Sequence, residues 1–71
     1  MKKADVIAKC ANGILQITKN QVFLFRDIAG MANCPALWGR FLHEEVVAGR
    51  LPGVIYIGKH PDANIDTYMR V

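Results

Sequence analysis

The most reactive side chains in this sequence belong to two cysteines and two histidines: Cys10, Cys34, His43 and His60. Thiolates and imidazoles are the usual ligands of zinc, and a zinc site pairs such ligands a few residues apart. No two of these four residues are spaced in that way. We therefore expect no metal, no disulfide framework and no cofactor, and we interpret the cysteines as small buried thiols.

A nucleophilic thiol beside a histidine is the other chemistry that these residues could perform. Cys34 and His43 are nine residues apart, which places them near opposite sides of a single helix. No third residue is positioned to orient the imidazole, and a chain of 71 residues has little room for a large catalytic cleft. The sequence therefore predicts a surface histidine and a protein that is not an enzyme.

The composition is that of a folded chain. Hydrophobic residues make up 52% and charged residues 21%, which predicts one globular domain over residues 1–71. The start, MKKADVIAKC, interrupts its apolar positions with Asp5 and Lys9, unlike a secretory signal. No apolar run approaches the roughly 20 residues that span a bilayer. These features predict a cytoplasmic protein that does not enter a membrane.

The elements that would position any functional residue follow from periodicity and from helix-ending residues. Ile7, Cys10, Ile14 and Ile17 recur at three- and four-residue spacing, which indicates a helix with one buried stripe. Pro35 suits the first turn of a helix, because the amide that it lacks would be unpaired there. The predicted elements are a helix over residues 4–18, a short strand at VFLF, a second helix over 27–32, a third helix over 35–48, and an antiparallel hairpin of strands 54–57 and 66–71.

This order of elements resembles the winged-helix domain, a variant of the helix-turn-helix. FLFRDIAG is similar to the small strand and second helix of that family, and PALWGRFLHEEVVAGRL to its third, recognition helix. VIYIGKHPDANIDTYMRV is similar to the wing. The resemblance covers nearly the whole chain. It implies an α+β fold: a three-helix winged helix with a short strand after helix one and a C-terminal β-hairpin wing.

The resemblance also implies how DNA would be bound, with the third helix in the major groove and the wing on the backbone. On the predicted third helix, Arg40 points outward and is the one strong donor placed to read guanine. Lys59 and His60 are expected at the hairpin tip, against the adjacent backbone. The net charge of +3 and the pI of about 9.1 permit DNA binding without requiring it. Further cations that could approach phosphates are Lys19, Arg26 and Arg70.

The third helix offers more apolar surface than one small core needs. Leu37 and Phe41 widen its apolar side beyond Trp38, and Glu45 lies within the widened arc. One interpretation is packing, in which the first helix covers Phe41 and Glu45 meets a basic residue at the edge of the core. The other interpretation is that Leu37, Trp38 and Phe41 contact a second subunit or a protein partner.

Two functions follow from these patterns. The first is a small protein that binds double-stranded DNA, a transcriptional regulator or accessory factor. It would act as a homodimer, because one module buries too little surface and contacts too few phosphates for high specificity. The alternative is a winged-helix adaptor that binds another protein and no DNA. Arg40, Lys59, His60 and Arg70 on one face would favour nucleic acid, whereas their scattering would favour the adaptor. Tyr56 and Tyr68 are similarly open to two interpretations, sheet packing or a base-stacking platform.

Overall fold

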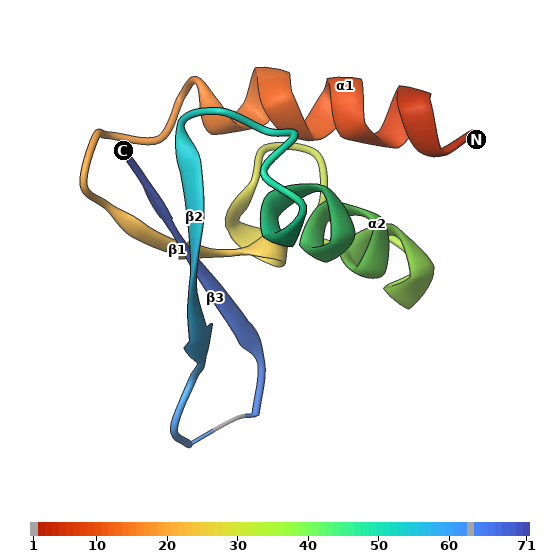
Figure 1. The fold of residues 1–71 in the computed structure, drawn as a ribbon. Helices are drawn as coiled ribbons and strands as arrows, with labels where there is room; N and C mark the ends of the chain where they lie inside the picture. The colour runs from red at the N-terminus through yellow and green to blue at the C-terminus, as the bar shows by residue number, and fades with distance from the viewer. Residues whose placement is uncertain (1, 63) are drawn as a thin grey trace.

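Figure 1 shows a computed structural model of the protein, which describes residues 2–62 and 64–71. Its α-helices are α1 (Lys3–Ile14) and α2 (Ala36–Val47), with a short 3-10 helix, η1 (Phe25–Asp27), between them. Its strands are β1 (Val22–Leu24), β2 (Val54–Lys59) and β3 (Asp66–Arg70). The predicted α+β class is therefore correct. In the described part of the chain, neither helix is both long and apolar enough to cross a lipid bilayer.

The three strands form one antiparallel sheet in the order β1-β3-β2. Tyr68 of the central strand lies opposite Phe23 on one side and opposite Tyr56 on the other. Its ring centroid is 5.8 Å from that of Phe23 and 5.7 Å from that of Tyr56, so three aromatic rings form a row on the inner face. The hairpin prediction is confirmed, and the two tyrosines pack within the sheet. A bulge between Tyr56 and Gly58 shifts the register of β2.

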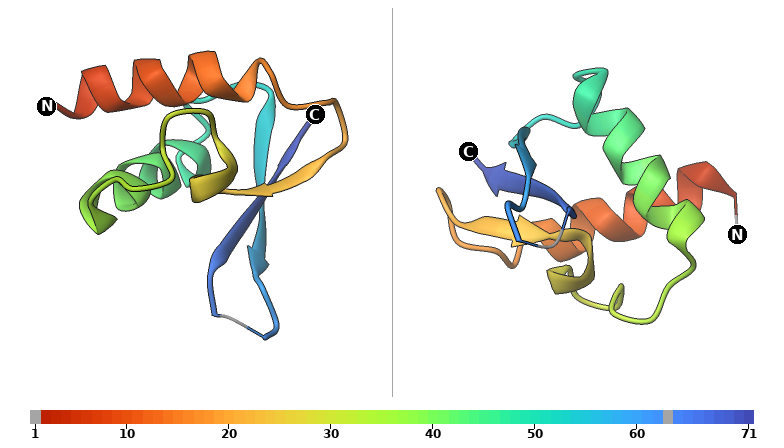
Figure 2. Two further views of the ribbon diagram at one scale, coloured as in Figure 1. Left: turned by 180° about the vertical axis from the view of Figure 1, so that it is seen from behind. Right: turned by 90° about the horizontal axis from the view of Figure 1, so that it is seen from below.

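The core forms where the two helices meet the inner face of the sheet. In Figure 1, α1 crosses one end of the sheet, α2 lies beside it, and the β2–β3 hairpin projects away from α1. Each part contributes fully buried side chains: Val6 and Cys10 from α1, Leu42 from α2, and Phe23 and Tyr68 from the sheet. Figure 2 shows the same arrangement from behind and from below. The hairpin tip therefore lies outside the core.

The predicted second helix is wrong, and with it the three-helix winged-helix fold. Where a helix was expected over residues 27–32, the chain makes the single 3-10 turn of η1 and then an irregular loop. The Asp27 carboxylate accepts a hydrogen bond from the Leu24 amide at 2.9 Å, which closes that turn without extending it. A segment this short forms too few backbone hydrogen bonds to offset the cost of helix nucleation. The loop is held instead by Ile28 and Met31, whose side chains are almost fully buried.

The other two helix predictions are confirmed with earlier ends. α1 stops at Ile14 rather than at residue 18, and Ile17 is buried in the turn that follows. Gly13 lies directly against the loop after η1, since a Cβ at this position would come within 2.4 Å of Ile28 Cγ2. Glycine thus permits a close approach between α1 and that loop. α2 is one residue shorter at each end than the predicted 35–48.

Candidate nucleic-acid interface

A groove of about 300 Å³ lies between the N-terminal half of α2 and the β2–β3 hairpin. We call it the α2–hairpin groove. Two of the predicted DNA contacts, Arg40 and Lys59, lie on its two opposite walls. The remaining lining residues are Phe25, Ala36, Gly39, Asn64, Ile65, Asp66 and Tyr68.

The α2 wall carries an unpaired positive charge. Arg40 is exposed, and no carboxylate pairs with it among the residues that the structure describes. The adjacent Gly39 packs against η1, since a Cβ there would lie 3.6 Å from the Phe25 ring, an ordinary van der Waals distance. Arg26 follows Phe25, is exposed, and has no ion pair in the same described residues. The unpaired guanidinium of Arg26 is therefore next in sequence to Phe25, which lines the groove.

The hairpin wall is organised by Asp66. Its Oδ1 accepts hydrogen bonds from Lys59 Nζ at 3.0 Å and from the Tyr56 hydroxyl at 2.9 Å, and its Oδ2 lies 3.4 Å from His43 Nδ1. Partial burial acts to raise the pKa of Asp66, but the Lys59 and Tyr56 hydrogen bonds outweigh it and the pKa lies below its ordinary value. The same hydrogen bond raises the pKa of Lys59. Asp66 thus holds Lys59 in position while offsetting part of its charge.

His43 joins α2 to the hairpin, a role that sequence reasoning missed. Its ring lies edge-on to Tyr56, with centroids 4.8 Å apart, and its Nδ1 is 3.5 Å from the Tyr68 hydroxyl. Burial raises the pKa of Tyr68. The predicted tyrosine pair could have signalled a polar partner on the facing helix, because buried hydroxyls require one. The contact between His43 and Asp66 could not be predicted from local sequence, since the two residues are far apart in the chain.

The hairpin tip contains His60, as predicted. The His60 Nδ1 accepts a hydrogen bond from the Asp62 amide at 3.2 Å, and its carbonyl accepts one from the Asn64 amide at 3.0 Å. These bonds shape the tip and leave the imidazole exposed. Asn64 lines the groove, so His60 lies at the edge of the same region as Lys59.

Arg70 and Lys19 lie at the other end of the sheet. The Arg70 guanidinium donates to the Ile17 carbonyl and, at 3.2 Å, to the Leu15 carbonyl, so it caps the C-terminal end of α1. Its own carbonyl accepts from the Asn20 amide at 2.6 Å, which brings the exposed Lys19 to this end as well. Figure 1 shows that end of β3 near α1 and far from the hairpin tip. The structure therefore brings Arg40, Lys59 and His60 together but separates them from Lys19 and Arg70.

The predicted interface residues differ in exposure. Leu37 is 52% exposed, whereas Trp38 and Phe41 are half-buried against the core. Lys3 of α1 lies over the Phe41 ring, with its Nζ 5.8 Å from the centroid. For Phe41, these contacts agree with the packing interpretation. Leu37 remains on the surface.

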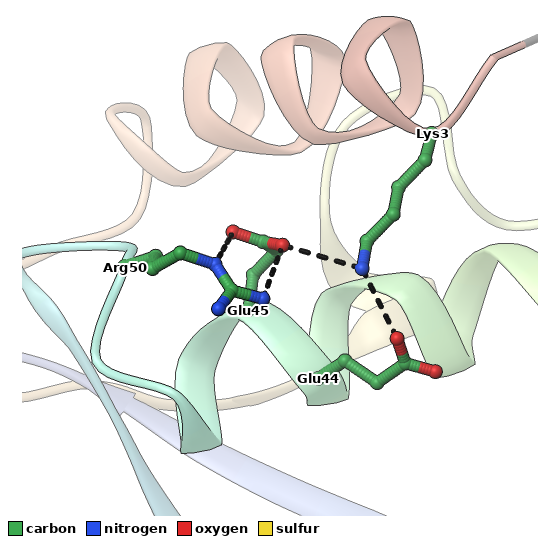
Figure 3. A network of polar contacts seen from close by, with 4 residues as sticks. All are labelled: Lys3, Glu44, Glu45 and Arg50. Carbon is green, nitrogen blue, oxygen red and sulfur yellow. Dashed lines mark hydrogen bonds and ion pairs between the residues drawn. The ribbon is translucent and has the colours of Figure 1, made fainter.

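Glu45 meets basic partners at the edge of the core, as the packing interpretation predicted. Figure 3 shows its carboxylate between Arg50, at 2.9 Å, and Lys3, at 3.3 Å, while Lys3 also pairs with Glu44 at 3.0 Å. Hydrogen bonding from Arg50 lowers the pKa of Glu45. We call these four residues the inter-helix ion cluster. It neutralises the acidic end of α2.

The two cysteines are free thiols. Cys10 is fully buried, and this burial raises its pKa to about 11, which makes it a poor nucleophile. The Cys34 thiol lies 3.6 Å from both the Gly30 carbonyl and the Met31 sulfur. Within residues 2–62 and 64–71, no group of three or more His, Cys, Asp or Glu side chains is arranged to hold a metal ion.

Comparison of the chain with protein-family models, with curated proteins and with solved structures found no match.

Proposed function

We propose that this protein binds double-stranded DNA through the α2–hairpin groove. In this proposal the N-terminal half of α2 enters the major groove and the hairpin lies along the adjacent backbone. The observation that carries it is the placement of Arg40 and Lys59 on opposite walls of one groove. A helix and a hairpin that each present a cation to the same space suit a ligand with closely spaced negative charges.

The charges around the groove support this proposal. The carboxylates that line the groove or lie on α2 are already engaged: Asp66 with Lys59, and Glu44 and Glu45 within the inter-helix ion cluster. Arg40 and Arg26 remain available. The first turn of α2 has no side-chain cap, and of its amides that of Trp38 donates to the Pro35 carbonyl at 3.0 Å, so the positive end of the helix dipole and the earlier amides add to the attraction for phosphate.

Side-chain size at the start of α2 also suits close approach to DNA. Ala36 and Gly39 lie in the groove wall, so little side-chain bulk separates this part of the α2 backbone from a ligand in the groove. Arg40 follows as the donor that can read the two acceptors of guanine. The hairpin that follows α2 supports the proposal, because it carries Lys59 to the groove wall opposite Arg40. The proposal includes regulation of transcription or an accessory role on DNA, in the cytoplasm.

The direct test is a titration with random-sequence duplex DNA at two salt concentrations. Wild-type affinity should fall steeply as salt rises, because bound counterions are released from each contacted phosphate. On random DNA, where Arg40 meets no fixed base, its guanidinium is expected to contact phosphate, so Arg40→Ala should weaken binding and lower the slope of log K against log salt by about one unit. Lys9→Ala is the matched control, since Lys9 is also exposed and unpaired among the described residues but lies on α1. Equal losses in the two variants would reject the groove as the binding site.

A protein-binding adaptor is the second candidate. It is favoured by the edge strand β2, where Ile55 and Ile57 are 42% and 45% exposed. An exposed aliphatic strand edge is a common docking site for another chain. Absence of any wild-type DNA binding at low salt would favour this candidate over the first.

A further inference from the structure

One side of α1 is apolar and is only partly covered by the rest of the chain. The helix buries Val6, Cys10 and Ile14 against the core, while an adjoining strip at helical spacing is only partly covered. Polar side chains lie on the opposite flank. We call this partly covered strip the α1 flank, and it consists of Ala4, Ile7, Ala8, Ala11 and Leu15.

The shape of the α1 flank is complementary to itself. Near the N-terminal end of α1, an open and largely apolar hollow of about 610 Å³ is lined by the three flank residues Ala4, Ile7 and Ala8 together with Lys3 and Glu45. Near the C-terminal end, Leu15 projects from the surface with 68% of its area exposed. A projection and a hollow at opposite ends of one helix fit each other when two copies lie antiparallel.

Charge favours a second copy at this surface. The two charged residues that border the hollow, Lys3 and Glu45, lie 3.3 Å apart and neutralise each other (Figure 3). The chain as a whole carries a net charge of +3, so two copies repel each other overall, and a surface without net charge favours their contact. The α1 flank is therefore a surface on which they can meet without like-charge repulsion.

We propose that the protein forms a homodimer through antiparallel packing of the α1 flanks. The two-fold axis passes near Ala11, where a small side chain allows the helices to approach, and Leu15 of each copy enters the hollow of the other. Parallel packing would instead set Leu15 against Leu15 and leave both hollows unfilled. This interface replaces Leu37, Trp38 and Phe41 as the site of dimerisation.

The proposal goes beyond DNA binding and does not depend on it. α1 lies on the opposite side of the molecule from the hairpin tip (Figures 1 and 2), so the dimer leaves the tip and its side of the α2–hairpin groove uncovered. A helix of 12 residues buries a small area on dimerisation. The dimer should therefore be weak and should dissociate in the micromolar range.

Sedimentation equilibrium at high micromolar concentration tests the interface. Wild type should have twice the 7.9 kDa mass of one chain, and Leu15→Lys should have the mass of one chain with an unchanged circular dichroism spectrum. Leu37→Lys is the control, since this exposed α2 residue lies outside the α1 flank, and it should remain dimeric. A monomeric wild type overturns the proposal, and so does a dimer that is broken by Leu37→Lys but not by Leu15→Lys.

Disulfide cross-linking tests the orientation. In a Cys34→Ser background, Ala11→Cys should form a covalent dimer on mild oxidation, because position 11 lies near the two-fold axis and meets itself. Ala4→Cys should not cross-link, because antiparallel packing separates the two copies of position 4. Efficient cross-linking at both positions would indicate parallel helices and would overturn the antiparallel arrangement.

Discussion

The two ends of α2 use charge in opposite ways. Toward its C-terminus, Glu44 and Glu45 are held by Lys3 of α1 and by Arg50, which follows the helix (Figure 3). Toward its N-terminus, Arg40 is exposed and has no carboxylate partner among the residues described. One end of the helix therefore fastens α1 and α2 together, while the other keeps a cation available for a ligand.

This difference shows why the charge of a helix is a poor guide to what the helix binds. The sequence of α2 contains two acidic residues and one arginine, a balance that would weaken binding to DNA. Pairing with residues from other elements removes the acidic charges from that balance. The unpaired charge that remains on α2 is then that of Arg40, and only the arrangement of α1 and of the turn after α2 makes the balance of this helix positive.

The largest expected effect is a loss of stability, and it distinguishes the buried face of α2 from the exposed positions of the same helix. Leu42→Ala should lower the free energy of unfolding by about 3 kcal/mol, because a fully buried leucine loses its contacts and leaves a cavity. Leu37→Ala, at an exposed position of the same helix, should cost less than about 1 kcal/mol. Urea denaturation measures both values. Similar losses would mean that the assigned buried face of α2 is wrong.

The next prediction concerns Asp66, the β3 carboxylate that lines the α2–hairpin groove. Asp66→Asn should cost about 1 kcal/mol of stability at neutral pH, since it weakens charge-assisted hydrogen bonds from Lys59 and Tyr56. The folded pKa of Asp66 lies below its ordinary value of 3.8, so this contribution is complete above pH 3.8 and is lost as pH falls through the folded pKa. Denaturant titrations over that pH range should show the wild type and the variant converging.

Asp62→Asn is the matched control for Asp66→Asn. Both acids belong to the hairpin, but Asp62 is exposed at the tip and its carboxylate makes no ion pair within the described residues. The control should leave stability nearly unchanged. Asp66→Asn should also strengthen binding to random DNA, because it releases the full charge of Lys59. Weaker binding by this variant would indicate that the position of Lys59 matters more than its charge.

A smaller effect is expected at the other end of α2, in the inter-helix ion cluster. Glu45→Gln should lower the melting temperature at pH 7, because Arg50 and Lys3 both lose a carboxylate partner. The pKa of Glu45 is held below its ordinary value of 4.5, mainly by hydrogen bonding from Arg50. Its contribution is therefore present above pH 4.5 and disappears as pH falls through the folded pKa. A difference in melting temperature that persisted below that pKa would have to come from packing rather than charge.

The smallest expected effect is on DNA affinity, and it tests whether the carboxylates at the C-terminal end of α2 repel DNA. Glu44→Gln should change the affinity for random DNA by less than about twofold, because Lys3 already offsets the charge of Glu44. The loss of affinity caused by Arg40→Ala, on the same helix, is the reference with which this change is compared. A gain from Glu44→Gln as large as the loss from Arg40→Ala would show that the carboxylate repels phosphate despite its partner.

The parts of the fold that the sequence determined are those with local signals. The spacing of apolar residues specifies α1 and α2, since one helical face must be buried wherever the helix packs. Pro35 marks the start of α2, and the turn residues between the last two strands specify the hairpin. The exposure of Arg40 followed from the same periodicity, because it lies opposite the stripe that contains Leu42.

Only the tertiary structure decided the segment between β1 and α2 and the roles of several charged residues. Ile28 and Met31 have helical spacing, yet they anchor a loop. Burying their side chains against α1 and the core lowers the free energy by more than the few hydrogen bonds of a short helix would. Arg70 resembles a phosphate ligand in the sequence, but it caps the end of α1. His43 and Asp66 meet only after α2 docks beside the hairpin. Each outcome depends on residues far apart in the chain, and the free energy of such contacts is set by which surfaces come together rather than by local spacing.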